Sequence, residues 1–275
     1  MNAAAERWKE ELAMWAIPQP ILDAAPESPY GFPAELFRRR AQHSTGTAPG
    51  LTTERASAAL PEGGSVLDVG VGGGATSLPL AARAGRLTGV DQQADMLAAF
   101  EAAALDVGVS VATVRGGWPD VAADVPDADV VICGHVVYNV PDLAPFAQAL
   151  DAHANRRVVM ELTERHPMSW MNDLWLTFHD LVRPSGPTDA DALAVLQELG
   201  IAPELETVTH AGDPAVSGFA RREDAVALVR RRLCLSAERD TEIVEALGDR
   251  LVERDGRWAA GPPGRAVATI WWDVS

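Results

Sequence analysis

The sequence predicts an α/β fold in which a doubly wound, mostly parallel sheet carries helices on both faces. Short apolar runs of strand length, at residues 65–69, 128–133 and 157–162, alternate with longer segments of helical periodicity. Continuously apolar strands are typical of a sheet that is covered on both sides. A glycine-rich turn at residues 70–74 directly follows the first apolar run, as in parallel sheets that bind a ligand at their strand ends.

The expected elements alternate along most of the chain. Up to residue 162 they are, in order, helix 54–60, strand 65–69, helix 75–84, strand 87–91, helix 93–105, strand 109–114, strand 128–133, helix 142–153 and strand 157–162. After that we expect helices at 169–182 and 189–199, a strand at 205–210, two helices within 222–254 and a strand at 266–274. Strands joined by helices pair in parallel, whereas the last two strands are candidates for an antiparallel pair.

The chain is expected to divide into a short N-terminal part and a main domain. Residues 1–50 are predicted to form a helical lid, because residues 18–50 combine Pro, Gly and Ser with apolar and aromatic side chains that need a surface to cover. Residues 51–275 are predicted to form the main domain, with helical insertions at about 164–200 and 221–255, after the fifth and sixth strands.

Composition favours a folded cytoplasmic protein and disfavours several partners. The chain has 275 residues, 47% of them hydrophobic, and a formal net charge of −16, which repels nucleic acid phosphates and anionic membrane surfaces. Cys133 and Cys234 are too few for a disulfide framework, and no metal-ligand spacing such as Cys-x-x-Cys is present. The first 15 residues mix charges with apolar side chains and therefore do not resemble a signal peptide or a membrane span.

The glycine-rich turn predicts a bound ligand that contains adenosine. Gly70, Gly72 and Gly74 have no Cβ atom, so the backbone can approach a ligand closely and can adopt a positive φ. Asp91 stands about 20 residues further on, at the carboxyl end of the adjacent strand, where a carboxylate accepts hydrogen bonds from ribose hydroxyls.

The residue before the turn distinguishes two kinds of ligand. The pattern Gly70-x-Gly72-x-x-Ala75 with Asp91 also fits the dinucleotide fingerprint, so an NAD-binding oxidoreductase is a competing interpretation. A carboxylate at Asp68, two residues before Gly70, would be repelled by a pyrophosphate but would suit an ammonium group.

The segment Leu67-Asp68-Val69-Gly70-Val71-Gly72-Gly73-Gly74, together with Val90-Asp91, resembles the first two motifs of the class I S-adenosylmethionine-dependent methyltransferases. The resemblance covers roughly residues 50–163 and implies a seven-stranded sheet, S-adenosylmethionine as the donor and S-adenosylhomocysteine as the product. It also implies that Asp68 and the glycines line the methionyl side, that Asp91 and Gln92 hold the ribose, and that Met96 packs near the adenine.

Two further motifs match the family in part. The third motif usually has an acidic residue that meets the adenine amino group, but Gly117 occupies that position here. A backbone contact from Gly117 and stacking of Trp118 beside the adenine would replace it, although Trp118 is equally compatible with a place in the core. The fourth motif matches residues 129–140, which place His135 and Tyr138 beside the transferable methyl group.

Methyl transfer needs an aligned nucleophile and, for a hydroxyl or a protonated amine, a base. His135 is the best candidate for the base and otherwise lines the cofactor, while Tyr138 could orient the acceptor or contact the sulfonium. His166 is a further catalytic candidate. The predicted pocket for a small apolar acceptor is lined by Tyr30, Phe37, Trp170, Trp175 and His179.

The sequence therefore predicts a methyltransferase that acts on a small molecule, and leaves the acceptor atom and the oligomeric state open. No Asp-Pro-Pro-Tyr or Asn-Pro-Pro-Tyr motif points to a nucleic acid base as the acceptor. Two alternatives stay open: a protein that binds S-adenosylmethionine without catalysis, and an NAD-dependent oxidoreductase. The second lacks a Tyr-x-x-x-Lys pair, since Lys9 is the only lysine.

Overall fold

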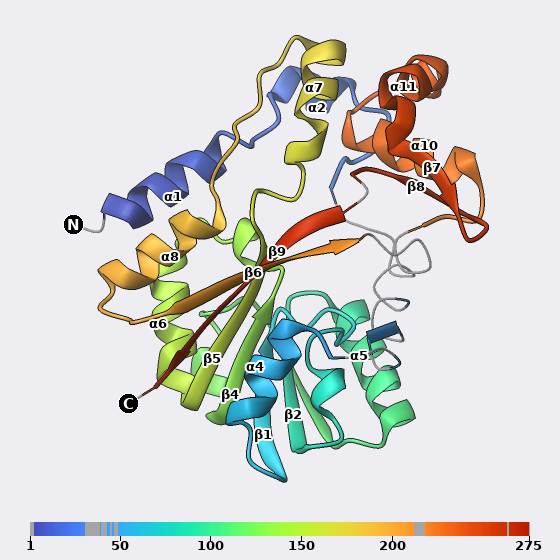
Figure 1. The fold of residues 1–275 in the computed structure, drawn as a ribbon. Helices are drawn as coiled ribbons and strands as arrows, with labels where there is room; N and C mark the ends of the chain where they lie inside the picture. Colours follow the sequence, from blue (N-terminus) through green and yellow to red (C-terminus); the bar gives the residue numbers. More distant parts are fainter. Residues whose placement is uncertain are drawn as a thin grey trace.

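A computed structural model of the chain describes residues 3–30, 39, 43–44, 46, 49–211, 218–262 and 264–274. Its centre is a seven-stranded sheet in the order β3-β2-β1-β4-β5-β9-β6 (Figure 1). The strands are β1 (Gly64–Val69), β2 (Ala84–Asp91), β3 (Val111–Arg115), β4 (Ala128–Gly134), β5 (Ala154–Thr163), β6 (Glu204–Ala211) and β9 (Gly264–Asp273). Strands β1 to β5 pair in parallel, and β9 runs antiparallel to both β5 and β6. The predicted fold class and the antiparallel pair are confirmed.

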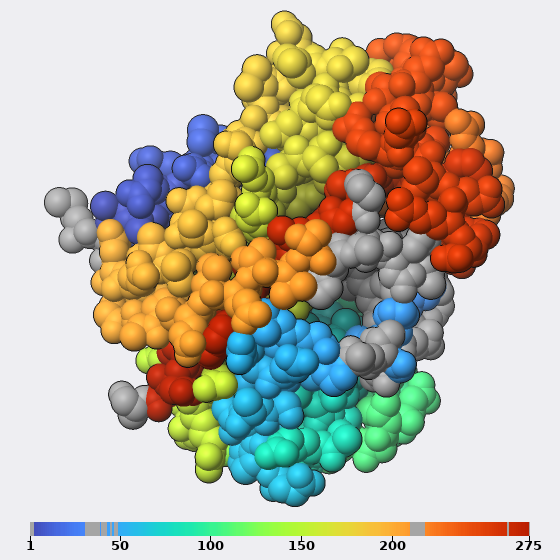
Figure 2. Space-filling model, in the orientation of Figure 1, coloured from blue at the N-terminus to red at the C-terminus, as the bar shows by residue number. Residues whose placement is uncertain are grey.

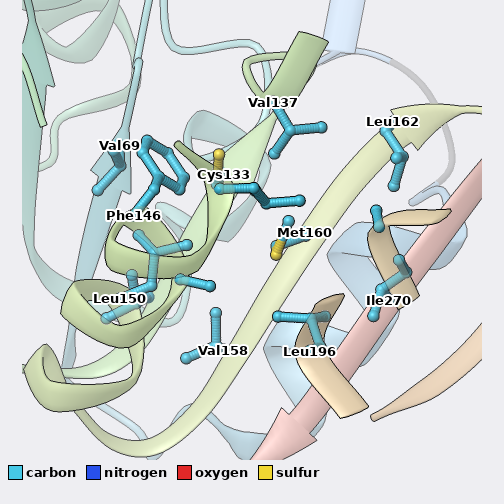
Figure 3. Packing of buried hydrophobic residues seen from close by; sticks show 14 of the residues in the cluster. Val69, Cys133, Val137, Phe146, Leu150, Val158, Met160, Leu162, Leu196 and Ile270 are labelled. Carbon is cyan, nitrogen blue, oxygen red and sulfur yellow. The ribbon is translucent and has the colours of Figure 1, made fainter. Parts of the chain in front are cut away.

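Helices cover both faces of this sheet. On one face lie α4 (Leu51–Ala59) and α5 (Ala94–Val107), which pack against side chains such as Val66 and Ile132. On the other face lie α1 (Ala3–Ala13), α6 (Leu143–His153) and α8 (Asp189–Glu198). Figure 3 shows this second layer, where Phe146 and Leu150 of α6 face Val158 and Met160 of β5. Alternate residues of each strand therefore serve two separate cores.

The N-terminal helix α1 is part of the layer that covers the sheet. Trp8 is fully buried, its indole Nε1 donates to the carbonyl of Val140 at 2.8 Å, and its ring stacks on Tyr138 with centroids 5.7 Å apart. Of the predicted lid, α1 thus lies against the sheet, whereas α2 (Gln19–Ala24) packs against a separate hydrophobic cluster around Leu174 and Trp175. Residues 31–38, which include Phe37, lie outside the described residues.

A cap with its own hydrophobic core follows the strand ends. It is built from α2, α7 (Asn172–His179), α10 (Arg222–Arg232), α11 (Asp240–Leu247) and the hairpin of β7 (Leu251–Arg254) and β8 (Arg257–Ala260). Trp175, Val229 and Ile243 are buried in this core. In Figure 2 the yellow surface of α7 is continuous with the orange and red surface of the C-terminal helices. The remaining short helices are 3₁₀ turns: η1 (Leu78–Leu80), η2 (Ala122–Asp124), η3 (Val137–Asn139), η4 (Ser169–Met171), η5 (Ala237–Arg239) and η6 (Gly248–Arg250).

The helix predicted at residues 75–84 is wrong. This segment forms turns and the single 3₁₀ turn η1, and β2 already begins at Ala84. Pro79 has no N–H for a helical hydrogen bond and disfavours the helical conformation of the residue before it. In addition, Ser77 is fully buried, and its hydroxyl donates a hydrogen bond to Asp68. This contact places the segment over the end of β1.

The second helix predicted within residues 222–254 ends early, because a β-hairpin follows it. Strands β7 and β8 pair through Asp255 and Gly256, whose φ angles are +51° and +70°. Asp-Gly is a strong signal for a two-residue hairpin turn, in which both central residues have a positive φ. The Asp255-Gly256 pair in the sequence therefore predicts this hairpin, and the expectation of a helix up to residue 254 is wrong.

Among the described residues, no helix combines the length and the apolar character that crossing a membrane requires.

Replacing Trp8 by alanine tests whether α1 belongs to the sheet domain. The substitution removes a fully buried indole with its hydrogen bond and leaves a cavity, so we expect it to lower the free energy of unfolding by about 3–5 kcal/mol in urea denaturation. Met14→Ala, at an exposed position beyond the end of α1, is the control and should change stability by less than about 0.5 kcal/mol. Equal stability of the two variants would contradict this placement of α1.

Candidate functional site

Four polar side chains meet at the carboxyl edge of the parallel strands. Asp68 and Asp91 stand near the ends of β1 and β2, His135 directly follows β4, and Glu161 lies near the end of β5. Parallel strands present their carboxyl ends at one edge of the sheet, and ligands bind there in open α/β folds. The site is therefore assembled from four neighbouring strands.

The glycine turn is held against Asp91. Gly70, Gly72 and Gly74 all have positive φ, as the sequence predicts. The N–H of Gly72 donates to Asp91 Oδ2 at 3.0 Å, and the N–H of Gln93 donates to Oδ1 at 2.9 Å. A Cβ atom on Gly70 would lie 2.3 Å from Val136 Cγ2, so only glycine fits there. Both carboxylate oxygens of Asp91 keep acceptor capacity for a ligand hydroxyl.

Asp68 is a buried carboxyl group with one unmatched oxygen. It is 1% exposed, its Oδ2 accepts a hydrogen bond from Ser77 Oγ at 2.6 Å, and its Oδ1 has no partner among the described residues. The pKa of Asp68 is raised to about 7, chiefly by burial; the nearby carboxylates of Asp91 and Glu161 also raise it, and the hydrogen bond from Ser77 opposes them. A buried acceptor in acidic surroundings suits a cationic group with N–H donors.

The turns after Gly74, which stand in place of the predicted helix, cover the ends of two strands at the site. Ser77 bonds to Asp68, and Thr76 occupies the space over Gly134, where a Cβ atom would lie 2.3 Å from the Thr76 hydroxyl. The chain therefore folds over the ends of β1 and β4 directly after the glycine turn.

His135 contacts Glu161 through its backbone and through its side chain. Its backbone has a φ of +59°, uncommon for a residue with a side chain, and its N–H donates to the carbonyl of Glu161 at 2.7 Å. Its ring Nε2 lies 3.0 Å from Glu161 Oε1. The other carboxylate oxygen, Oε2, accepts from Thr52 Oγ1 at 2.5 Å, and Thr52 shares a 2.8 Å hydrogen bond with Thr269.

This arrangement distinguishes the two ring nitrogens of the imidazole. When Nε2 donates to Glu161, Nδ1 is left as the nitrogen that can accept a proton. The side chain of His135 is 47% exposed, so a ligand can reach it. Sequence reasoning identified His135 but missed Glu161. The signal was an acidic residue inside the otherwise apolar run of β5.

The third motif packs partly against α6. The indole Nε1 of Trp118 donates to the carbonyl of Phe146 at 3.3 Å, and its ring meets His153 edge to face at 4.9 Å, so Trp118 packs against α6. These contacts fit the alternative that the sequence left open, in which Trp118 packs in the core, and its stacking beside an adenine stays a prediction. The side-chain amide of Gln92 reaches Gly117, and Met96 is buried on α5.

The side chains of Tyr138 and His166 pack against other parts of the protein. The hydroxyl of Tyr138 donates to the carbonyl of Thr163 at 2.6 Å, and burial raises the pKa of Tyr138 well above its usual range. His166 stacks on Trp15 with centroids 3.7 Å apart. Burial, helped by the charge of Arg183, lowers the pKa of His166 to about 3, so its ring is neutral at physiological pH. Of the three predicted catalytic residues, His135 is the one whose side chain lies at the strand edge with about half of its surface exposed, and its role as a base stays a prediction.

The predicted pocket residues lie in or beside the cap. Tyr30 is exposed, Trp170 and Trp175 pack with the cap core, and His179 Nε2 contacts the carbonyl of Leu233 at 2.6 Å. Trp175 also stacks against the guanidinium of Arg183 at 5.0 Å. No hydrogen bond or ring contact in the described part of the chain joins these four residues to Asp68 or His135, so their role in binding an acceptor stays a prediction.

Comparison with known proteins gives a family match for the central part of the sheet domain. Residues 66–155 match the family model described as a methyltransferase domain. The ubiquinone biosynthesis O-methyltransferase of Sodalis glossinidius is 33% identical over 112 residues, which are 40% of this chain and 45% of that protein. An uncharacterized protein of Haemophilus influenzae is 28% identical over 213 residues, 76% of both chains. The solved structure of the YcgJ protein of Bacillus subtilis, 18% identical, is similar with a TM-score of 0.52 over 85% of this chain and 98% of that one.

The matched segment spans less than half the length of the Sodalis enzyme. The likeness to the Bacillus subtilis structure concerns the fold alone.

Asp68→Asn tests the raised pKa. The folded protein holds a proton on Asp68 up to about pH 7, whereas the unfolded chain releases it near pH 3.8, the ordinary pKa of the group, so the proton stabilises the fold fully below pH 3.8. We expect the free energy of unfolding to fall by up to about 1.4 kcal/mol per pH unit between pH 4 and 7, and the variant to lose this slope. Urea titrations across this range measure it. Asp124→Asn, at an exposed position, is the control and should keep the slope.

Proposed function

We propose that this chain, whose residues 66–155 belong to the class I S-adenosylmethionine-dependent methyltransferase family, transfers a methyl group from S-adenosylmethionine to a hydroxyl group of a small molecule. The observation that carries the proposal is the His135–Glu161 pair at the same strand edge as the acidic glycine turn. One part of this edge suits the donor, and the other part suits an acceptor that must lose a proton.

The residues at the edge fit S-adenosylmethionine. The unmatched Oδ1 of the buried Asp68 would accept a hydrogen bond from the ammonium group, and the carboxylate of Asp91 would hold the ribose hydroxyls. The close backbone at Gly70 and Gly72 leaves room for the ligand chain. S-adenosylmethionine supplies an activated methyl group whose leaving group is a neutral thioether. A dinucleotide pyrophosphate would meet the carboxyl of Asp68 instead, which disfavours NAD.

The protein's own part in the reaction is to orient the acceptor and to remove its proton. His135 Nδ1 would take the proton of the hydroxyl, so that the O–H bond breaks as the oxygen becomes the nucleophile. The resulting imidazolium would be stabilised by the negative charge of Glu161, whose Oε1 lies 3.0 Å from Nε2. Thr52 holds Glu161 in place from α4, and Thr269 holds Thr52 from β9.

Several features support a small molecule with an acceptor oxygen. The matched relative from Sodalis glossinidius is named as an O-methyltransferase. The net charge of −16 disfavours nucleic acid as the acceptor. A hydroxyl is also the acceptor that gains most from a base, since its oxygen is a poor nucleophile while it is protonated.

Calorimetric titration tests the donor. We expect S-adenosylmethionine and S-adenosylhomocysteine to bind, and NAD to show no measurable binding. Asp91→Ala removes the acceptor for the ribose hydroxyls and should weaken binding at least about tenfold. Asp95→Ala, at an exposed position in the first turn of α5, is the matched control and should bind like the native chain. Binding of NAD without binding of the other two compounds would overturn the proposal.

Transfer of a labelled methyl group to a panel of catechols and hydroxybenzoates tests the base. With an accepted substrate, His135→Gln should lower kcat by about 10²–10⁴-fold and leave donor affinity unchanged. Glu161→Gln keeps the shape but removes the charge, so it should lower kcat less and change its pH profile. Asn139→Ala, an exposed change in the same loop, should keep kcat. Unchanged turnover in His135→Gln would exclude it as the base.

A further inference from the structure

We propose that Asp120 supplies the carboxylate that recognises the 6-amino group of the donor's adenine, in place of the acidic residue that position 117 lacks. The inference rests on the proposed function, since it concerns how the same donor is bound. It concerns a residue that the sequence pattern does not mark, because Asp120 stands three positions after Gly117.

The position of the adenine follows from Asp91. The N–H of Gly116 donates to the carbonyl of Asp91 at 3.0 Å, and Asp91 pairs with Arg115 in the sheet register. The end of β3 therefore lies directly beside the carboxylate that would hold the ribose. A base attached to that ribose and pointing away from the glycine turn meets the segment 116–120.

Two side chains converge on the space that a side chain at position 117 would fill. A Cβ atom built on Gly117 would lie 3.3 Å from Gln92 Nε2 and 3.8 Å from Asp120 Oδ2. The turn brings Asp120 back, since the N–H of Val121 donates to the carbonyl of Gly117 at 3.2 Å. Trp118 points the other way, onto α6. The carboxylate of Asp120 thus lies beside the position that an acidic side chain at residue 117 would occupy.

The chemistry of this pair matches one edge of adenine. A carboxylate accepts the hydrogen bond that the 6-amino group donates, and the amide nitrogen of Gln92 donates to the adjacent ring nitrogen. Asp120 is exposed and forms no hydrogen bond or ion pair with the rest of the described chain, in contrast to Asp129, which is held by Ser65 and Arg156. Its carboxylate is therefore available to a ligand.

Binding of two nucleosides tests the inference. S-adenosyl-L-homocysteine presents an amino group at the 6-position, and S-inosyl-L-homocysteine presents a carbonyl oxygen that a carboxylate repels. We expect the native chain to prefer the adenine compound at least about tenfold in calorimetric titration. Asp120→Asn should lose this preference, because its amide can donate to the carbonyl. Asp124→Asn, in the following turn, should keep it.

A second variant separates recognition from a disturbed fold. Gly117 lacks a positive φ, and its nearest neighbour is the end of the Gln92 side chain, so aspartate fits there. Gly117→Asp combined with Asp120→Asn should restore the preference for adenine. Equal preference in the native chain and in Asp120→Asn would overturn the inference and leave the proposed function intact. Failure of the native chain to bind S-adenosyl-L-homocysteine would overturn both.

Discussion

The buried carboxyl group of Asp68 constrains the structure around it. It lies near the end of β1, in the middle of the sheet between β2 and β4, where burial penalises its negative charge. The hydroxyl of Ser77 donates a hydrogen bond to it, and the chain after the glycine turn folds back over the strand ends with Ser77 buried against Asp68. Turns and the 3₁₀ turn η1 stand there in place of the predicted helix. The glycine turn, the missing helix and the unmatched oxygen are therefore parts of one arrangement.

The parts of the site that the sequence predicts are those fixed by the backbone. The glycines and Asp91 follow from the βαβ pattern, because a strand end and a tight turn have local signatures, and both lie where expected. Glu161 could not be predicted as the partner of His135, since the two meet only through the pairing of β4 with β5. The contact of Trp118 with α6 could not be predicted for a related reason: an aromatic residue in a turn has two sides to pack on, and this contact is a tertiary one. Local pattern thus predicts the glycine turn and the acidic strand end, whereas the positions of Glu161 and Trp118 depend on long-range contacts.

The acidic character of the chain has a local and a general part. Most of the net charge of −16 is spread over the surface, where water and salt screen it. The carboxyl groups of Asp68, Asp91 and Glu161 are different, because they lie close enough for the latter two to raise the pKa of the first. Backbone N–H groups, Ser77 and Thr52 offset part of this charge. The remainder is concentrated at the edge where a cationic ligand would lie.

That remaining charge distinguishes the donor from the product. A sulfonium carries a positive charge that a thioether lacks, so the transfer removes one cation from a space bordered by carboxylates. Contacts of the ammonium group with Asp68 and of the ribose with Asp91 would be common to both molecules, whereas the attraction to the sulfonium would be lost on reaction. In the proposed mechanism, proton capture by His135 would add a positive charge beside Glu161 at the same moment and would further reduce the negative potential that favoured the donor. An acidic edge of this kind therefore holds the charged reactant more firmly than the neutral product and favours their exchange.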